Sequence, residues 1–152
     1  MPPNLSIAAI NKLSLHFNLA NKSYMQDWEL EVADKNKIQD FISGYDSIAS
    51  TDEDKVALMG LIIASMDQLL KQIIYQEVNR LQEFDKYWRK LKNILVKDLP
   101  LHKDLILYWY RLDAENCDEY FSISPYIRGL NIDIESLYRE YIEAEKKTIK
   151  NC

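Results

Sequence analysis

The feature that most constrains the fold is an apolar segment that begins just after Ser50 and predicts one long, buried helix. Ser50 and Glu53 have the spacing of a capping box, in which each side chain hydrogen-bonds the backbone at a helix start. Acidic residues fill positions 52–54, where the helix dipole favours negative charge. Helical spacing relates Val56, Met59, Ile63, Met66, Leu70 and Ile73, and Leu58, Leu61 and Ile62 make the first half apolar nearly all round. We expect this helix to be the centre of the core.

The composition favours the same fold class. A chain of 152 residues with three glycines and four prolines is typical of helices joined by short connections. Its length fits one domain that buries roughly 70% of the surface of the unfolded chain, so no metal or disulfide is needed for stability. We expect a mainly α, compact domain of about five or six helices over residues 1–152. Residues 1–33 would form an N-terminal arm, and residues 34–150 the helical body.

Helix boundaries can be placed from caps and breakers. The apolar pattern continues past Tyr75 as far as Leu95, but one helix over this whole length would be roughly 60 Å long, too long for a compact domain. We therefore expect a break between Tyr75 and Asp85, with Asn79 or Asp85 as the next cap. Further boundaries are predicted at Asp34 (a cap), Gly44 (a left-handed helix end), Ser124 (a cap before Pro125), Gly129 (a stop) and Asp133 (the last cap).

The N-terminal arm has the alternation of a β-hairpin. Residues 13–19 and 27–32 each alternate apolar and polar side chains, as half-buried strands do. The polar connector at residues 20–26 can close them into an antiparallel pair. Their shared buried face would consist of Leu13, Leu15, Phe17, Leu19, Trp28, Leu30 and Val32. The alternative is an irregular arm followed by an early helix, because Trp28 and Val32 also have i, i+4 spacing.

Negative charge is concentrated in residues 27–54, where nine acids and two bases give −7, against −5 for the whole chain. Residues 55–152 hold fifteen acids and fifteen bases. So concentrated a field favours a basic partner. The pI of 5.1 and the lack of a Lys/Arg cluster argue against direct nucleic-acid binding. Helix starts explain Asp34 and the acids at 52–54, which leaves as candidate partner-binding residues Asp27, Glu29, Glu31, Asp40 and Asp46.

A second acidic stretch, residues 113–124, is expected to form a loop and is the rival surface. Its candidate partner-binding acids are Asp113, Glu115, Asp118 and Glu119. Just before it stand Tyr108, Trp109 and Tyr110, three consecutive aromatics that cannot all face the core from one helix. Interfaces are enriched in Tyr and Trp, so Tyr108 and Tyr110 join the candidates. Core packing with ordinary amphipathic tyrosines explains the same residues.

No motif in the sequence indicates catalysis. The histidines are His16 and His102, and no His-x-x-x-His, Cys-x-x-Cys or Glu-x-x-His spacing or glycine-rich phosphate loop occurs. We expect no metal, no cofactor and no enzymatic activity. Asp98 and His102 can meet across Pro100, and a structural contact is favoured over an acid–base pair. Cys117 stands among acidic residues and has no recognisable base and orienting group at its side, which argues against a nucleophile.

The remaining features predict a cytoplasmic protein without membrane contact. The N-terminus has no positive charge before its short apolar run, unlike a secretory signal. The longest apolar run, residues 56–64, has nine residues, whereas a membrane-spanning helix needs about 20. Cys117 and Cys152 are isolated thiols and do not form the pattern of an exported disulfide scaffold. We expect a monomer or a weak dimer.

Several segments resemble a family of small bacterial cytoplasmic proteins, some of which are similar to immunity proteins encoded beside polymorphic or contact-dependent inhibition toxins. These segments are DWELEVAD at 27–34, residues 41–45, ALMGLIIASMD at 57–67, Leu101-His102 leading to Tyr108-Trp109, and FSISPYIR at 121–128. The resemblance implies a protein that binds and neutralises a cognate toxin domain, commonly a nuclease with a basic cleft. It transfers no contact residues, because immunity surfaces differ from toxin to toxin. The alternative is a helical adaptor or regulatory protein with a non-toxin partner.

Overall fold

The computed structural model describes residues 5–20, 27–75, 78–137 and 139, and this part of the chain is mainly α-helical, as predicted. The α-helices with defined bounds are α1 Ile7–Phe17, α2 Trp28–Glu31, α3 Ile38–Ser47, α4 Asp52–Tyr75, α5 Leu81–Lys97, α6 Lys103–Tyr110 and α7 Ser124–Arg128. Short 3₁₀ turns form at Val78–Arg80, Leu99–Leu101 and Cys117–Glu119. Residues 134–137 are helical as well, and no described residue lies in a β-strand.

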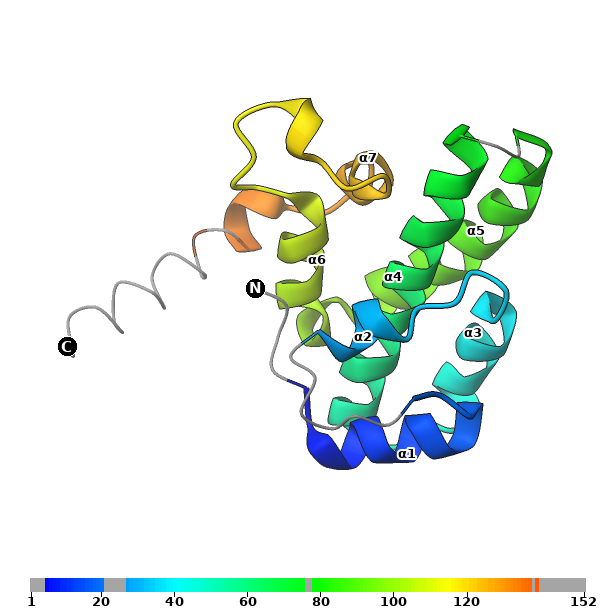
Figure 1. The fold of residues 1–152 in the computed structure, drawn as a ribbon. Coiled ribbons are helices and arrows are strands. Elements are labelled where there is room, and N and C mark those ends of the chain that lie inside the picture. The colour runs from blue at the N-terminus through cyan, green and yellow to red at the C-terminus, as the bar shows by residue number, and fades with distance from the viewer. Residues whose placement is uncertain (1–4, 21–26, 76–77, 138, 140–152) are drawn as a thin grey trace.

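Helix α4 is the central helix, which confirms the prediction. It packs against α1, α2, α3 and α5 (Figure 1). Every residue from Ala57 to Asp67 is buried. By length and composition α4 could cross a membrane, but 78% of its most apolar stretch is buried inside the protein. The core therefore accounts for its apolar surface.

The start of α4 is capped one residue later than predicted. Thr51 Oγ1 accepts a hydrogen bond from Asp54 N at 3.1 Å, and Asp54 Oδ2 accepts one from Thr51 N at 3.3 Å. The Asp54 carboxylate also forms a 2.7 Å ion pair with Lys12 of α1. Burial acts to raise the pKa of Asp54, but Lys12 and the backbone donors of Ser50 and Thr51 outweigh it, so the pKa is lowered. Asp54 replaces Glu53 in the box because Asp54 faces α1.

The predicted N-terminal β-hairpin is wrong, because α1 and α2 form where its strands were expected. Ser6 caps α1 by accepting a hydrogen bond from Ala9 N at 3.3 Å. Leu13 is buried and Phe17 packs on the core four residues later, whereas Leu15, assigned to the same face, is 86% exposed. Trp28 and Val32 are both buried, as the early-helix alternative requires. Most of the predicted connector, residues 21–26, lies outside the described residues.

Two predicted boundaries of α3 are also wrong. Gly44 does not end the helix: it is buried inside α3, and a Cβ atom there would lie 2.5 Å from Phe17 Cζ. Glycine is needed here for the close approach of α1. The N-cap of α3 is Lys37, not Asp34. Asp34 Oδ1 instead accepts a hydrogen bond from Asn36 N at 2.9 Å in the turn before α3.

The later boundaries follow the predictions more closely. The break after Tyr75 is confirmed, although the residue that precedes α5 is Arg80 rather than Asn79 or Asp85. Gly129 ends α7, and Asp133 Oδ1 accepts a hydrogen bond from Ser136 N at 3.2 Å, as expected of the last cap. Ser124 is not a cap but the first residue of α7. Helix α6 and the loop after it lie across α4 from α3 (Figure 1), whereas Tyr126 of α7 packs on Phe84 and Trp88 of α5.

Candidate functional site: an acidic surface around Tyr108

The aromatic triplet of α6 divides between the core and the surface. Trp109 is buried, while Tyr108 and Tyr110 are half-buried on either side of it. The Tyr108 ring packs on Phe121, with ring centroids 5.3 Å apart. Tyr108 and Tyr110 therefore keep part of their rings available to a partner, as the sequence suggested.

Carboxylates from two other helices gather around the Tyr108 phenol. Burial raises the pKa of Tyr108, the charges of Asp27 and Glu29 raise it further, and Asp67 of α4 adds a smaller effect. Arg111 opposes the shift. Asp27 is exposed at the start of α2, and its charge acts on the Tyr108 phenol, so one predicted acid influences one predicted tyrosine. These residues form the centre of the candidate site.

The predicted acidic loop follows α6 and is held by two arginines. Arg111 adopts a left-handed conformation with φ of 57°, donates from Nε to Glu119 O at 3.1 Å, and lies over the Phe121 ring. Arg128 donates from Nε to Tyr110 O and from Nη2 to Arg111 O, both at 2.9 Å. Its guanidinium lies 4.2 Å and 4.1 Å from the ring centroids of Tyr110 and Tyr120. Both arginines thus fix the backbone of the loop.

The loop presents its acids to solvent. All four predicted acids are exposed, namely Asp113, Glu115, Asp118 and Glu119. Glu119 Oε2 also accepts a hydrogen bond from Glu115 N at 3.0 Å, and Asp113 lies 3.6 Å from Arg111 Nη1. At the far end, Asp67 Oδ1 accepts a hydrogen bond from Ile123 N at 2.9 Å, which ties the loop to α4. The acidic surface is therefore built on an anchored backbone.

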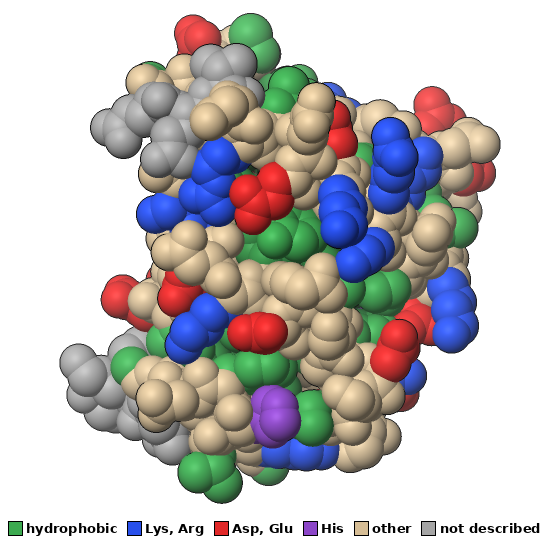
Figure 2. Space-filling model, turned by 90° about the vertical axis from the view of Figure 1, so that its right-hand side faces the viewer, with side chains coloured by type: hydrophobic (Ala, Val, Ile, Leu, Met, Phe, Trp, Pro, Cys, Tyr) green, Lys and Arg blue, Asp and Glu red, His purple; other side chains and the backbone are tan. Residues whose placement is uncertain are grey.

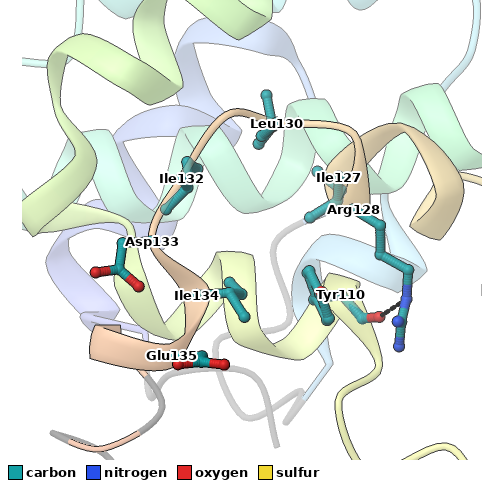
Figure 3. Close-up of a pocket in the computed structure, with 8 residues that line it drawn as sticks. All are labelled: Tyr110, Ile127, Arg128, Leu130, Ile132, Asp133, Ile134 and Glu135. Atoms are coloured by element: carbon teal, nitrogen blue, oxygen red, sulfur yellow. Dashed lines mark hydrogen bonds between the residues drawn. The ribbon is translucent and has the colours of Figure 1, made fainter.

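A pocket of about 260 Å³ adjoins this loop (Figure 3). Its lining is half polar: Arg128, Asp133 and Glu135 line it together with Tyr110, Ile127, Leu130, Ile132 and Ile134. Figure 3 shows Arg128 turned toward the Tyr110 carbonyl. The pocket adds two carboxylates to this side of the molecule.

The structure does not bring all the predicted residues together. Glu31 is exposed on α2, one turn from Asp27. Glu29 is only 3% exposed and is not available for direct contact, because its side chain packs inward at α4. Asp40 and Asp46 are exposed on α3, where Asp40 lines a groove with His16 and Asp46 lies near Tyr45. We use the name acidic surface for the predicted residues of α2, α6 and the following loop that are exposed or half-buried, namely Asp27, Glu31, Tyr108, Tyr110, Asp113, Glu115, Asp118 and Glu119.

Charge is separated across the molecule. Helix α5 contains five bases and two acids, whereas residues 103–137 contain seven acids and three bases. Figure 2 looks onto the side where α3 and α5 lie and shows Lys and Arg side chains spread over it between acidic ones. A basic partner would therefore meet a favourable field on the α6 side and a mixed one on the α5 side.

His102 and Asp98 belong to a buried network at the turn before α6. Tyr45 Oη donates to Asp98 Oδ2 and lies 2.7 Å from both that atom and His102 Nε2. The Tyr45 hydroxyl gives its only proton to Asp98, so in its contact with His102 the hydroxyl oxygen accepts a hydrogen bond from a protonated Nε2. The other ring nitrogen, Nδ1, then has no partner among the described residues. Burial raises the pKa of Tyr45 and lowers that of His102 to about 4. Both side chains are under 3% exposed, and the network joins α3 to the α5–α6 turn.

Sequence reasoning missed the residues that organise the site. Arg111 binds a backbone carbonyl eight residues away, Arg128 binds carbonyls seventeen and eighteen residues away, and Asp67 binds a backbone N–H 56 residues away. None of these interactions leaves a periodic or motif signal. The predicted contact of Asp98 with His102 was partly correct, but the bridging residue is Tyr45, far away in the sequence.

The described residues contain no group of three or more His, Cys, Asp or Glu side chains that could hold a metal ion. No family model matches the sequence, and no curated protein and no solved structure is similar to it. The resemblance to immunity proteins therefore stays a prediction.

Proposed function

We propose that this protein is a cytoplasmic, non-enzymatic immunity protein that binds and neutralises a cognate toxin domain, a basic nuclease, through the acidic surface. The observation that carries the proposal is the anchored loop of residues 112–122. Arg111 and Arg128 use their donors on its backbone, so four exposed acids stand on a fixed frame next to Tyr108.

A prearranged acidic surface suits rapid capture of a basic protein. Complementary fields raise association rates above the roughly 10⁵ to 10⁶ M⁻¹ s⁻¹ of uncharged partners. A backbone that is already ordered also avoids part of the entropy cost of binding. Half-buried tyrosines supply apolar contact area beside the charges, the combination that interfaces favour. Speed and preorganisation are the properties that an inhibitor of a nuclease requires.

The test is binding of this protein to the product of the adjacent gene, with two matched charge variants. The loop variant carries Glu115→Gln and Asp118→Asn, and the control variant carries Asp40→Asn and Asp46→Asn on α3, so each loses two negative charges. We expect the loop variant to associate roughly tenfold more slowly at low salt, and the control to associate nearly as fast as the natural protein. Stopped-flow fluorescence measures both rates.

Salt and cell protection complete the test. The association rate of the natural protein should fall clearly from low to physiological ionic strength, because screening shortens the range of the field. Cells that express the toxin should survive only when the protein is present. Absence of both a complex and protection contradicts the proposal. A tight complex with a harmless protein supports the adaptor alternative instead.

A further inference from the structure

The outer face of α1 carries an exposed apolar stripe. Leu15 is 86% exposed and Ile7 is 61% exposed. Asn11, midway between them, and Ala8 are exposed as well. Residues four apart lie on one face of a helix, so Ile7, Asn11 and Leu15 form a line along α1. Leu13, which is fully buried, lies on the inner face. The stripe is therefore not part of the core.

The stripe is symmetrical about Asn11. Ile7 lies four residues before Asn11 and Leu15 four residues after it, about 6 Å along the helix axis in each direction. When a second copy of α1 lies antiparallel with its Asn11 opposite this one, each Ile7 contacts the Leu15 of the other copy. The two Asn11 amides can hydrogen-bond each other, because each has both a donor and an acceptor. A self-complementary face of this kind is what a two-fold dimer requires.

The charges around the stripe favour a second copy over other occupants. Helix α1 contains no acidic residue, although the chain carries −5. Lys12, beside the stripe, contacts Asp54 Oδ2 and Ser50 Oγ, each at 2.7 Å. Two copies therefore meet at α1 with little local repulsion. An anionic lipid surface fits less well, because Asp54 neutralises Lys12 and leaves His16 as the other base of this helix.

The position and size of α1 set the strength of such a contact. Figure 1 shows α1 at the opposite end of the molecule from the loop after α6, so a contact through α1 leaves that loop free in both copies. A helix of 11 residues is roughly 16 Å long, and a pair of such helices buries less than the roughly 1,200 Å² of a stable complex. The contact is therefore a weak one.

We propose that two copies of this protein associate through α1, antiparallel about a two-fold axis at Asn11, with a dissociation constant on the order of 100 µM. The inference does not depend on toxin binding. Because each copy carries −5, salt should strengthen the association by screening the repulsion between the copies. This salt effect is opposite in sign to the one expected for the toxin complex.

The test is sedimentation equilibrium of the natural protein and its variants from roughly 20 µM to 1 mM. Ile7→Glu places a charge against the Leu15 of the second copy, twice in each dimer, so the dissociation constant should rise at least roughly tenfold. An acid in the first turn of a helix is favourable, so α1 itself stays folded. Ile74→Glu in α4 is the matched control: Ile74 is also 61% exposed, and the same added charge should change the constant less than roughly twofold.

A double variant tests the antiparallel register. Ile7→Glu with Leu15→Lys sets opposite charges against each other across the dimer, whereas within one helix the two positions are about 12 Å apart. The double variant should associate at least roughly fivefold more tightly than either single variant. Absence of this rescue contradicts the register.

Other outcomes contradict the α1 dimer as a whole. They are a natural protein that stays monomeric at the highest concentration, association that weakens as salt is added, and equal losses in Ile7→Glu and Ile74→Glu. Binding of monomeric protein to anionic lipid vesicles that Ile7→Glu abolishes would assign the stripe to a membrane instead. None of these outcomes bears on the proposed function, because toxin binding is measured with dilute protein.

Discussion

Two buried polar clusters at different places in the fold show how differently a core can treat ionisable groups. In the Tyr45–Asp98–His102 network, the phenol forms two contacts of 2.7 Å, and three elements are joined. At the α2–α4–α6 junction, Glu29 is buried equally well, but one of its oxygens has no partner among the described residues. The first cluster is held by the two contacts of the Tyr45 hydroxyl, although His102 Nδ1 has no partner among the described residues, whereas Glu29 Oε2 has no hydrogen bond to offset its burial. The three predictions below test this contrast.

The largest expected effect is acid destabilisation through His102. Burial lowers its pKa from 6.5 to about 4, so between these values the unfolded chain binds a proton that the folded protein does not. The free energy of unfolding should therefore fall as the pH drops from 6.5 to 4, by about 3 kcal/mol in total. Urea unfolding at half-unit pH steps measures it.

The control for this prediction is His102→Gln, which cannot titrate. It should start less stable at pH 7 but lose less stability over the same pH window. The lowered pKa values of Asp54 and Glu83 act at still lower pH, so they do not produce a fall between 6.5 and 5. The raised pKa of Glu29 acts in the opposite direction over this range, so the decisive curve is that of Glu29→Met: if it is flat above pH 5, His102 is not held in its neutral form.

The next largest loss of stability is expected at Tyr45, the central residue of the Tyr45–Asp98–His102 network. Tyr45→Phe removes one hydroxyl and leaves Asp98 and His102 without it, so we expect the free energy of unfolding to fall by about 2 kcal/mol. Tyr126→Phe is the matched control, because that ring packs on Phe84 and Trp88 and no hydrogen bond of its hydroxyl is seen within the described residues. Equal losses in both variants would refute a special role for the network.

The smallest effect has the opposite sign and concerns Glu29. Glu29→Met replaces the buried carboxyl with an apolar group of similar length, and we expect the protein to gain about 1 kcal/mol at pH 7. The pKa of Glu29 in the folded protein is raised above the ordinary carboxyl value of 4.5. The destabilisation by the buried carboxylate is therefore absent below pH 4.5 and develops as the pH rises through the folded-state pKa. The gain should therefore vanish near pH 4.

Glu31→Met on the same helix is the comparison for this gain. Glu31 is exposed, so its replacement should leave the free energy of unfolding nearly unchanged at both pH values. A loss of stability in Glu29→Met would mean that the carboxyl already has a partner.

The fold was predictable where local signals and burial agree. The apolar run from Val56 to Ile73 can be buried in a compact domain only as a central helix. The break after Tyr75 follows because one uninterrupted helix would be too long for the domain. The N-terminal prediction failed because residues 13–19 fit both periods: Leu13 and Phe17 satisfy alternation and also i, i+4 spacing. Packing of Phe17 on Gly44 and of Trp28 against α4 decided for the helix.

The candidate site was predictable only as a set of exposed acids and tyrosines. Sequence alone determined that residues 27–54 carry −7, that three aromatics follow each other on α6, and that an acidic loop comes next, because these are properties of neighbours along the chain. Only the tertiary structure decided that Glu29 is buried and that the charge of Asp27 acts on Tyr108. It also decided that Arg128 holds the loop. These facts depend on contacts between residues far apart in the chain, and burial and charge act through space, not along the sequence.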